Sequence, residues 1–330
     1  MPEPVITVKN LVKAYGELRA VDGISFDVQK GEVFAFLGPN GAGKTTTVEI
    51  IETIRRQTSG EVKILGMDVK RDKSGIVPRI GVLPQQFSSF DRITVEETVQ
   101  YYARLFGMKG VDAGALIRLV NLEDKRKEMY KNLSGGLKQR LGIAIALVND
   151  PEIVFLDEPT TGLDPRARHE VWEVLEGLKK QGKTIFLTTH YMEEAELLAD
   201  NLAIISKGKI IETGSPEKVV QKNAKYQVLT LKGVDEKAFQ IIASMGFEPQ
   251  RSNHKNLSVR VGKTEDVLGI LERMKDEKVG YVSFDVRMPN LEEVFLMLTG
   301  ETLVTEGGDG AKPEEAPPKR TWGKVNQEAD

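Results

Sequence analysis

The sequence contains no cysteine, which excludes disulfides, thiolate metal ligands and a cysteine nucleophile together. It also lacks a basic excess, because 46 Lys and Arg side chains face 49 Asp and Glu, for a net charge of -3. A nucleic-acid partner is therefore not expected. No apolar run approaches the roughly 20 residues that span a bilayer, and the start MPEPVITVKN has no signal-peptide pattern. We expect a chain that is soluble when isolated.

Short apolar runs between helical patterns are typical of strands buried on both faces of a mostly parallel sheet. Such runs occur at residues 33–37, 80–83, 153–156, 185–187 and 202–205. Two earlier segments, 5–8 and 24–28, alternate apolar and polar residues and predict a small antiparallel sheet. Between about residues 88 and 150 the pattern turns helical. The sequence thus predicts an α/β fold with an antiparallel β subdomain and an inserted helical subdomain.

Polar residues follow four of the apolar runs, at the point where each predicted strand ends. GPNGAGKT (38–45) follows the first, Gln85 the second, Asp157 and Glu158 the third, and His190 the fourth. Ligands of open α/β sheets bind outside the carboxyl ends of the strands. We therefore expect these groups to converge on one site.

GPNGAGKT fits the pattern GxxxxGK[ST], in which glycines let backbone N–H groups crowd around phosphate oxygens at a helix N-terminus. It predicts a P-loop NTPase core. Lys44 should reach the β and γ phosphates, the Thr45 hydroxyl should ligate Mg²⁺, and Thr46 should reach the α phosphate. The other loop residues expected to bind the nucleotide are Gly38, Pro39, Asn40, Gly41, Ala42 and Gly43.

Two more motifs narrow the class of NTPase. LSGG, which ends in Ser134, Gly135 and Gly136, stands at the start of a predicted helix, and LDEP ends a buried strand. A carboxylate at Asp157 would be costly there unless it faced a cation such as Mg²⁺. The combination of GPNGAGKT, LSGG and LDEP resembles the nucleotide-binding subunit of ATP-binding cassette (ABC) transporters over about residues 4–216.

The resemblance implies an ATPase with ATP and Mg²⁺ as cofactors. In the family pattern Glu158 polarises the attacking water, His190 contacts the γ phosphate and Lys44 holds the phosphates. Gln85 senses the metal and the water, with Gln86 as the alternative for this role. The residues then expected at the metal are Thr45, Gln85 and Asp157.

The resemblance also implies a dimer. Ser134, Gly135 and Gly136 would meet the γ phosphate of ATP held by the opposite subunit, and Asp164 would lie in the dimer-contact loop. Tyr15 would stack on adenine. The alternatives are that Ser134 and Asp164 only cap helices and that Tyr15 only packs. One copy of each motif predicts a homodimer or a pairing with a homologous ATPase subunit.

The rest of the chain predicts a second module and a tail. Residues 221–300 read as strand, helix, strand, strand, helix, strand, the order of a ferredoxin-like α+β module, and end in the helix LEEVFLMLTG. We expect that helix to dock on the module or on a twin subunit. Residues 301–330 are rich in glycine, proline and charge and predict disorder. The ATPase domain would then span residues 1–220.

These predictions favour an ATPase that energises a separate membrane permease and works at the cytoplasmic face of the membrane. The permease would dock around residues 85–93, as the resemblance implies. The ending LEEVFLMLTG resembles exporter ATPases that handle antibiotics, drugs, polysaccharides or ions. A soluble ABC ATPase acting on DNA or ribosomes and an importer ATPase are the alternatives. The stretch from Gln85 to Ser134 is too short for a coiled coil, and the C-terminal part is short for an importer.

Overall fold

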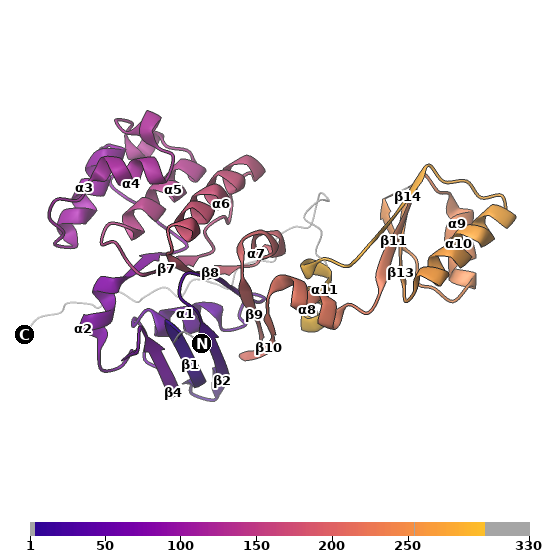
Figure 1. Ribbon diagram of the computed structural model, residues 1–330, viewed down its shortest axis with the longest axis horizontal. Coiled ribbons are helices and arrows are strands. Elements are labelled where there is room, and N and C mark those ends of the chain that lie inside the picture. The colour runs from indigo at the N-terminus through magenta and orange to yellow at the C-terminus, as the bar shows by residue number, and fades with distance from the viewer. Residues whose placement is uncertain (1–3, 254, 301–330) are drawn as a thin grey trace, which may run out of the picture.

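The computed structural model describes residues 4–253 and 255–300. Its largest sheet has six strands in the order β10-β9-β3-β8-β7-β6 (Figure 1). All neighbours are parallel except β9 and β10. Their bounds are β3 (Val33–Leu37), β6 (Ile80–Leu83), β7 (Ile153–Asp157), β8 (Thr184–Thr189), β9 (Asn201–Ser206) and β10 (Lys209–Gly214). The predicted parallel sheet is confirmed.

Both faces of this sheet are buried. Val33, Ala35 and Leu37 point into one apolar cluster with the helices, whereas Phe34 and Phe36 point into a second cluster with the antiparallel strands. This alternation along β3 explains why its sequence is apolar throughout. The helices on the first face include α5 (Gly135–Ala146), α6 (Pro165–Lys180) and α7 (Met192–Leu198), while α1 (Lys44–Ile51) belongs to the second cluster.

The antiparallel subdomain is a four-stranded sheet in the order β2-β1-β4-β5. Its strands are β1 (Ile6–Tyr15), β2 (Leu18–Val28), β4 (Ser59–Ile64) and β5 (Met67–Asp68). They are followed by the short helices α2 (Lys73–Ile76) and η1 (Val77–Arg79). The predicted segment 5–8 begins one residue before β1, and it and segment 24–28 cover only parts of these two strands, because register shifts in the pair interrupt the alternation of side chains.

The helical subdomain lies where the sequence predicts it. It contains α3 (Val95–Leu105), α4 (Ala113–Leu119), η2 (Glu123–Lys125), η3 (Tyr130–Asn132) and the start of α5. Thr94 and Glu97 form a capping box at the start of α3, and Asp112 caps α4. Among the described residues no helix is long and apolar enough to cross a bilayer.

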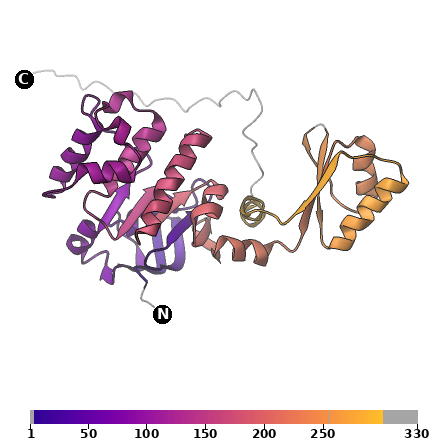
Figure 2. The same cartoon turned by 45° about the horizontal axis from the view of Figure 1, so that its top comes forward.

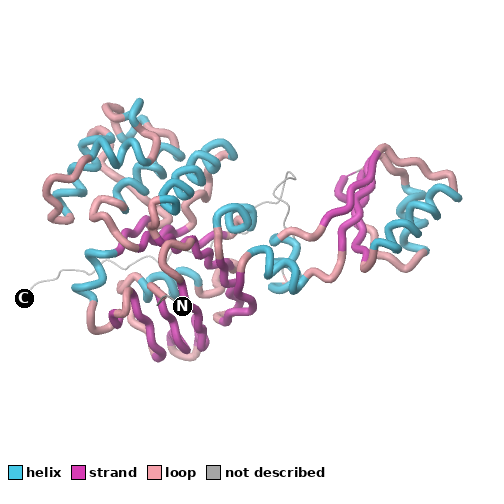
Figure 3. The backbone as a smooth tube through the Cα atoms, in the orientation of Figure 1, coloured by secondary structure: helices cyan, strands magenta, loops and turns pink. Residues whose placement is uncertain are grey.

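The C-terminal module has the predicted ferredoxin-like order. Its strands β11 (Gln227–Lys232), β12 (Gln250–Asn253), β13 (Asn256–Val261) and β14 (Ser283–Arg287) form an antiparallel sheet in the order β12-β13-β11-β14. Helices α9 (Glu236–Ser244) and α10 (Thr264–Asp276) cover one face (Figure 3). A separate apolar cluster lies between them, so the module has a core of its own.

The last helix, α11 (Leu291–Thr299), packs elsewhere than expected. Leu291 and Val294 are fully buried in the helix-side cluster of the large sheet, against α7 and α8 (Pro216–Asn223), and not in the core of the module. In Figure 2 α11 is seen end-on between the two bodies. The expectation that it docks on the core of the module is wrong, because periodicity reveals an apolar face but not its partner, and docking on a twin subunit stays a prediction. The predicted disorder of 301–330 lies outside the described residues.

Candidate functional site

A cleft of about 780 Å³ opens at the carboxyl ends of the central strands. The register places Leu37 beside Thr189 and Asp157 beside Thr188, so the strand ends meet there. Of the residues predicted from the sequence, the cleft is lined by Gly38, Pro39, Asn40, Gly41, Gly43, Lys44, Thr45, Thr46, Gln85, Glu158 and His190. Distant segments therefore converge as predicted, but Asp157, which the sequence also placed there, is not among the residues that line the cleft. The lining also includes Thr161, Met192, Glu292, Phe295 and Leu296, which the sequence did not single out.

The loop before α1 needs glycine for two close approaches. A Cβ on Gly38 would lie 2.4 Å from the carbonyl oxygen of Ile205, and one on Gly43 would lie 2.3 Å from that of Ala20. Gly43 also has a φ of 105° and serves as the N-cap residue of α1. Ala42 differs from its neighbours in the loop, because its side chain is buried in the apolar core and does not line the cleft.

Lys44 is held inside the loop. Its ammonium donates hydrogen bonds to the carbonyl oxygens of Gly38, at 2.6 Å, and Pro39, at 3.2 Å. The side chain is only 7% exposed. A buried cation at a helix N-terminus makes this end of the cleft a site for an anion such as a polyphosphate.

Glu158 is the polar centre of the cleft. Its Oε2 accepts hydrogen bonds from Gln85 Nε2, at 3.0 Å, and Thr161 Oγ1, at 3.1 Å. His190 Nδ1 lies 3.4 Å from the same oxygen. Gln85 lines the cleft and Gln86 does not, so the geometry favours Gln85 for the predicted role.

The backbone of Glu158 is fixed as firmly as its carboxylate. Its φ is 48°, in the left-handed region that non-glycine residues rarely adopt. The N–H donates to both the carbonyl oxygen and Oγ1 of Thr188, at 3.1 and 3.0 Å. The sequence analysis did not single out Thr188, but the structure shows that it holds this backbone.

Asp157 fits a site for a hard cation. Burial raises the pKa of its carboxyl and the Glu158 charge acts in the same direction, whereas a hydrogen bond from Thr188 Oγ1, at 2.5 Å, lowers it. A nearby cation would offset the cost of the buried charge. The atoms of Thr45, Gln85 and Asp157 that would bind the metal are all oxygens. Gln85 donates its hydrogen bond to Glu158 through Nε2, so its amide oxygen stays available as a metal ligand. These donors fit Mg²⁺.

A second buried carboxyl, Glu52, follows α1. It is 7% exposed, and burial raises its pKa to about 8, with further contributions from the charges of Asp157 and Glu49. Nothing in the pattern IETI distinguishes this glutamate from a surface residue. Its burial results from the packing of α1 against the sheet, which sequence spacing does not reveal.

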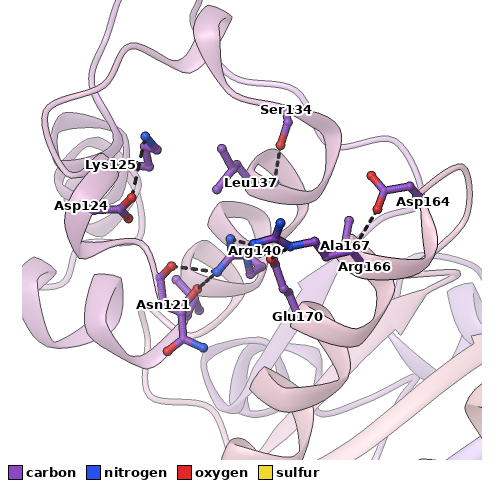
Figure 4. Close-up of polar contacts among 11 residues, drawn as sticks. Asn121, Asp124, Lys125, Ser134, Leu137, Arg140, Asp164, Arg166, Ala167 and Glu170 are labelled. Atoms are coloured by element: carbon purple, nitrogen blue, oxygen red, sulfur yellow. Dashed lines mark hydrogen bonds and ion pairs between the residues drawn. The ribbon is translucent and has the colours of Figure 1, made fainter.

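The residues of LSGG lie outside the cleft, at the start of α5 (Figure 4). Ser134 Oγ accepts from the N–H of Leu137, at 3.4 Å, and Asp164 accepts from the N–H of Ala167, at 2.9 Å, so both act as helix caps. A Cβ on Gly136 would lie 2.7 Å from the Cβ of Ala167. Because glycine has no Cβ, α5 can lie this close to α6.

Arg140 connects these two helices to the helical subdomain. It donates to the carbonyl oxygen of Asn121, at 2.7 Å, and to Glu170 on α6, at 3.1 Å (Figure 4). The sequence gave no signal for this contact.

Tyr15, predicted to stack on adenine, also lies outside the cleft lining. Its ring is 42% exposed, and the Lys13 ammonium and the Arg55 guanidinium lie 4.9 and 5.6 Å from its centre. An exposed aromatic face of this kind can accept a planar ligand.

A doubly covered parallel sheet, with a glycine-rich loop before a helix and with an acidic residue and a histidine at neighbouring strand ends, is typical of a P-loop ATPase. Residues 21–161 match the family model described as ABC transporter. The relatives below match at 39% identity over almost their whole lengths. The chain belongs to the family of ABC transporter ATP-binding proteins, and it is an ATPase of that family.

Two of these relatives are named Nod factor export ATP-binding protein I. The one from Paraburkholderia xenovorans (strain LB400) is 39% identical over 92% of this chain and 99% of the relative. The one from Rhizobium meliloti (strain 1021) is 39% identical over 92% of this chain and 90% of the relative.

Two solved structures cover about two thirds of this chain. A dimeric ATP-binding cassette in a post-hydrolysis state, bound to ADP and Pi, has a TM-score of 0.57 and 28% identity, and covers 64% of this chain and 98% of that one. A protein from Clostridium perfringens that is part of an ABC transporter complex has a TM-score of 0.59 and 28% identity, and covers 67% of this chain and 94% of that one.

Proposed function

We propose that ATP hydrolysis by this chain drives a separate membrane permease that exports its cargo. The observation that carries the proposal is the extent of the similarity. The relatives named for Nod factor export match 92% of this chain, so the match must include much of the C-terminal module. The solved cassettes cover only 64–67% of it. The module is thus shared with ATPases named for export.

In the proposed reaction Glu158 orients and polarises the attacking water. Gln85 and Thr161 hold its Oε2, and His190 lies beside the same oxygen and would contact the γ phosphate. Lys44 and the backbone of the loop bind and orient the phosphates, and Tyr15 stacks on the adenine. Thr45, Gln85 and Asp157 would hold Mg²⁺, which would supply positive charge to offset the charge that develops on the phosphate oxygens.

A second ATPase subunit completes the site. Ser134, Gly135, Gly136 and Asp164 lie outside the cleft of their own chain, at two capped helix starts that suit an anion presented by a partner. A twofold dimer would place them over the nucleotide of the other subunit. The similarity to a cassette solved as a dimer supports this arrangement.

Mixing two variants tests the dimer. Ser134→Arg should leave ATP binding intact but block closure, whereas Lys44→Ala should lose ATP affinity. An equimolar mixture should recover turnover from one working site per dimer. A mixture no more active than the separate variants would contradict the shared site.

The surface beside α3 is the proposed permease dock. A groove of about 310 Å³ is lined by Ile54, Val77 and Phe106, which are 65%, 43% and 55% exposed. Phe106 follows α3, and Phe90, in the segment 85–93 expected to bind the permease, packs edge-on against Tyr101 of the same helix, with ring centres 5.2 Å apart. Exposed apolar side chains of this kind mark interaction sites.

The export proposal is tested by co-purification from membranes. The tagged wild type should carry an integral membrane permease, whereas Phe106→Glu should lose it and keep its basal ATPase activity. Leu268→Glu on α10 is the matched control, since Leu268 is 56% exposed and far along the chain from the groove. Retention of the permease by Phe106→Glu would contradict the docking site.

A further inference from the structure

Helix α11 forms one wall of the nucleotide cleft. Glu292, Phe295 and Leu296 line the same cavity as the phosphate-binding loop, Glu158 and His190. The helix is anchored there, because Leu291 and Val294 are fully buried in the ATPase core. The last helix of the described residues, which follows the C-terminal module in sequence, therefore reaches the candidate ATP site.

Polar contacts tie α11 to the cleft on one side and to the module on the other. The N–H of Leu291 donates to the carboxylate of Glu196 on α7, at 2.5 Å, and α7 begins at Met192, which also lines the cleft. Toward the module, Arg287 of β14 donates to both carboxylate oxygens of Glu293, at 2.8 and 3.0 Å. Such a bidentate pair fixes the geometry between strand and helix.

The charge that α11 brings to the cleft opposes its ligand. Among the described lining residues the carboxylates are Glu158 and Glu292, while Lys44 is the lysine or arginine that faces them. Glu158 is held by Gln85 and Thr161 and belongs to the water-activating site. Glu292 is an exposed residue that adds a negative charge to a wall that must accept a triphosphate, and like charges repel, with a strength that water and salt reduce.

We propose that α11 is a brake on nucleotide binding. The Glu292 carboxylate repels the phosphates and so weakens ATP binding, and the Arg287–Glu293 pair lets a change in the C-terminal module alter the position of this charge. The coupling is reciprocal. If ATP binding changes the affinity of the module for a partner by some factor, that partner changes the affinity for ATP by the same factor. The inference rests on ATP binding in this cleft, but not on export.

The first test measures nucleotide affinity of the full chain by calorimetry, with a non-hydrolysable ATP analogue and Mg²⁺. Glu292→Gln should tighten binding of the triphosphate by roughly 3- to 10-fold, with a smaller gain for ADP, and the gain should shrink at high salt. Glu265→Gln is the matched control, because it removes the same charge from the first turn of α10, in the module. It should leave affinity unchanged.

Unchanged or weaker triphosphate binding in Glu292→Gln would overturn the brake. So would an equal gain for AMP and the triphosphate, which would indicate a packing effect. Failure of the wild type to bind any nucleotide is a different result, since it would refute the ATP site itself.

The second test follows the link to the module by hydrogen exchange. Adding the triphosphate analogue should change the exchange of the β14 backbone in the wild type. In Arg287→Met, which keeps the length of the side chain but removes the pair with Glu293, this response should be lost. The proposed link would be refuted if nucleotide left the hydrogen exchange of β14 unchanged in the wild type. It would also be refuted if Arg287→Met still showed the change.

Discussion

The ATPase core and the C-terminal module use sheets in opposite ways. In the core, strands such as β8 are buried at every residue, and their ends deliver polar groups to one cleft. In the module, the edge strand β14 is exposed at every residue. A sheet that is covered on both faces can hold charged groups at its strand ends in fixed positions. A sheet with an exposed edge strand such as β14 is suited to contacts with other molecules.

The two regions also differ in how they treat buried charge. In the core, Glu194 is fully buried, and its Oε1 accepts hydrogen bonds from Thr160 Oγ1 and Trp172 Nε1, each at 3.1 Å. Burial raises the pKa of this carboxyl. In the module, pairs such as Arg251 with Glu236 lie at the surface. Buried, hydrogen-bonded charged groups therefore lie in the core, whereas the ion pairs of the module lie at its surface.

The largest expected effect comes from the centre of the cleft. Glu158→Gln should lower ATP turnover by roughly 10²-fold or more while ATP binding survives, because the amide cannot act as the base. The variant should accumulate as an ATP-bound dimer in gel filtration. Glu265→Gln in the module is the control and should keep full turnover. Near-normal hydrolysis in Glu158→Gln would contradict the proposed role of Glu158 as the base.

Helix α11 sharpens the boundary between the regions. Phe295→Ala should destabilise the ATPase core by about 3 kcal/mol through the cavity it leaves, whereas Leu229→Ala should destabilise the module by a similar amount. Scanning calorimetry with and without nucleotide separates the two, because bound ligand raises only the core transition. If Phe295→Ala shifted the transition that nucleotide leaves unchanged, α11 would belong with the module.

Glu52 predicts a pH dependence confined to the core. Its pKa is raised from 4.5 to about 8, so the folded state keeps a proton that the unfolded chain releases. The free energy of unfolding should therefore fall as the pH rises from about 4.5 to about 8. Relative to wild type, Glu52→Gln should gain up to about 4 kcal/mol at pH 8 and almost nothing at pH 4.5, because a pKa raised by one unit corresponds to about 1.4 kcal/mol. Urea unfolding at both pH values measures this, and an equal difference at both would contradict the buried neutral carboxyl.

The smallest effect is expected at the open edge of the module. Val282, next to β14, is 82% exposed, so Val282→Ser should change the free energy of unfolding by less than about 0.5 kcal/mol. Thermal unfolding of the isolated chain measures it. A loss of several kcal/mol would mean that the edge is covered in solution, for example by a second copy.

The parts of the molecule that the sequence predicted share one property, a local pattern that determines a local structure. The run at 33–37 matches β3 residue for residue because burial on both faces leaves no polar position. GPNGAGKT is equally local, since glycine is needed where the backbone of Ile205 and Ala20 approaches. Because ligands of open α/β sheets bind outside the carboxyl ends of the strands, the sequence also predicted that Gln85, Glu158 and His190 lie at the cleft.

The features that were missed depend on contacts distant in sequence. Phe295 and Leu296 have the spacing of any amphipathic helix, and only the packing of α11 on α7 and α8 places them at the ATP site. Glu52 is charged in sequence but buried by packing. Thr161 lies in the loop between β7 and α6, and spacing alone could not distinguish its hydroxyl from its neighbours.

Because α11 belongs to the core but lies after the module, the core is discontinuous in the chain. A ribosome that adds roughly 5–20 residues per second releases α8 several seconds before α11. During that interval the strands of the large sheet can pair and the module can fold, but the last wall of the ATP cleft does not yet exist. The nascent chain therefore completes its nucleotide site only after the module has been made.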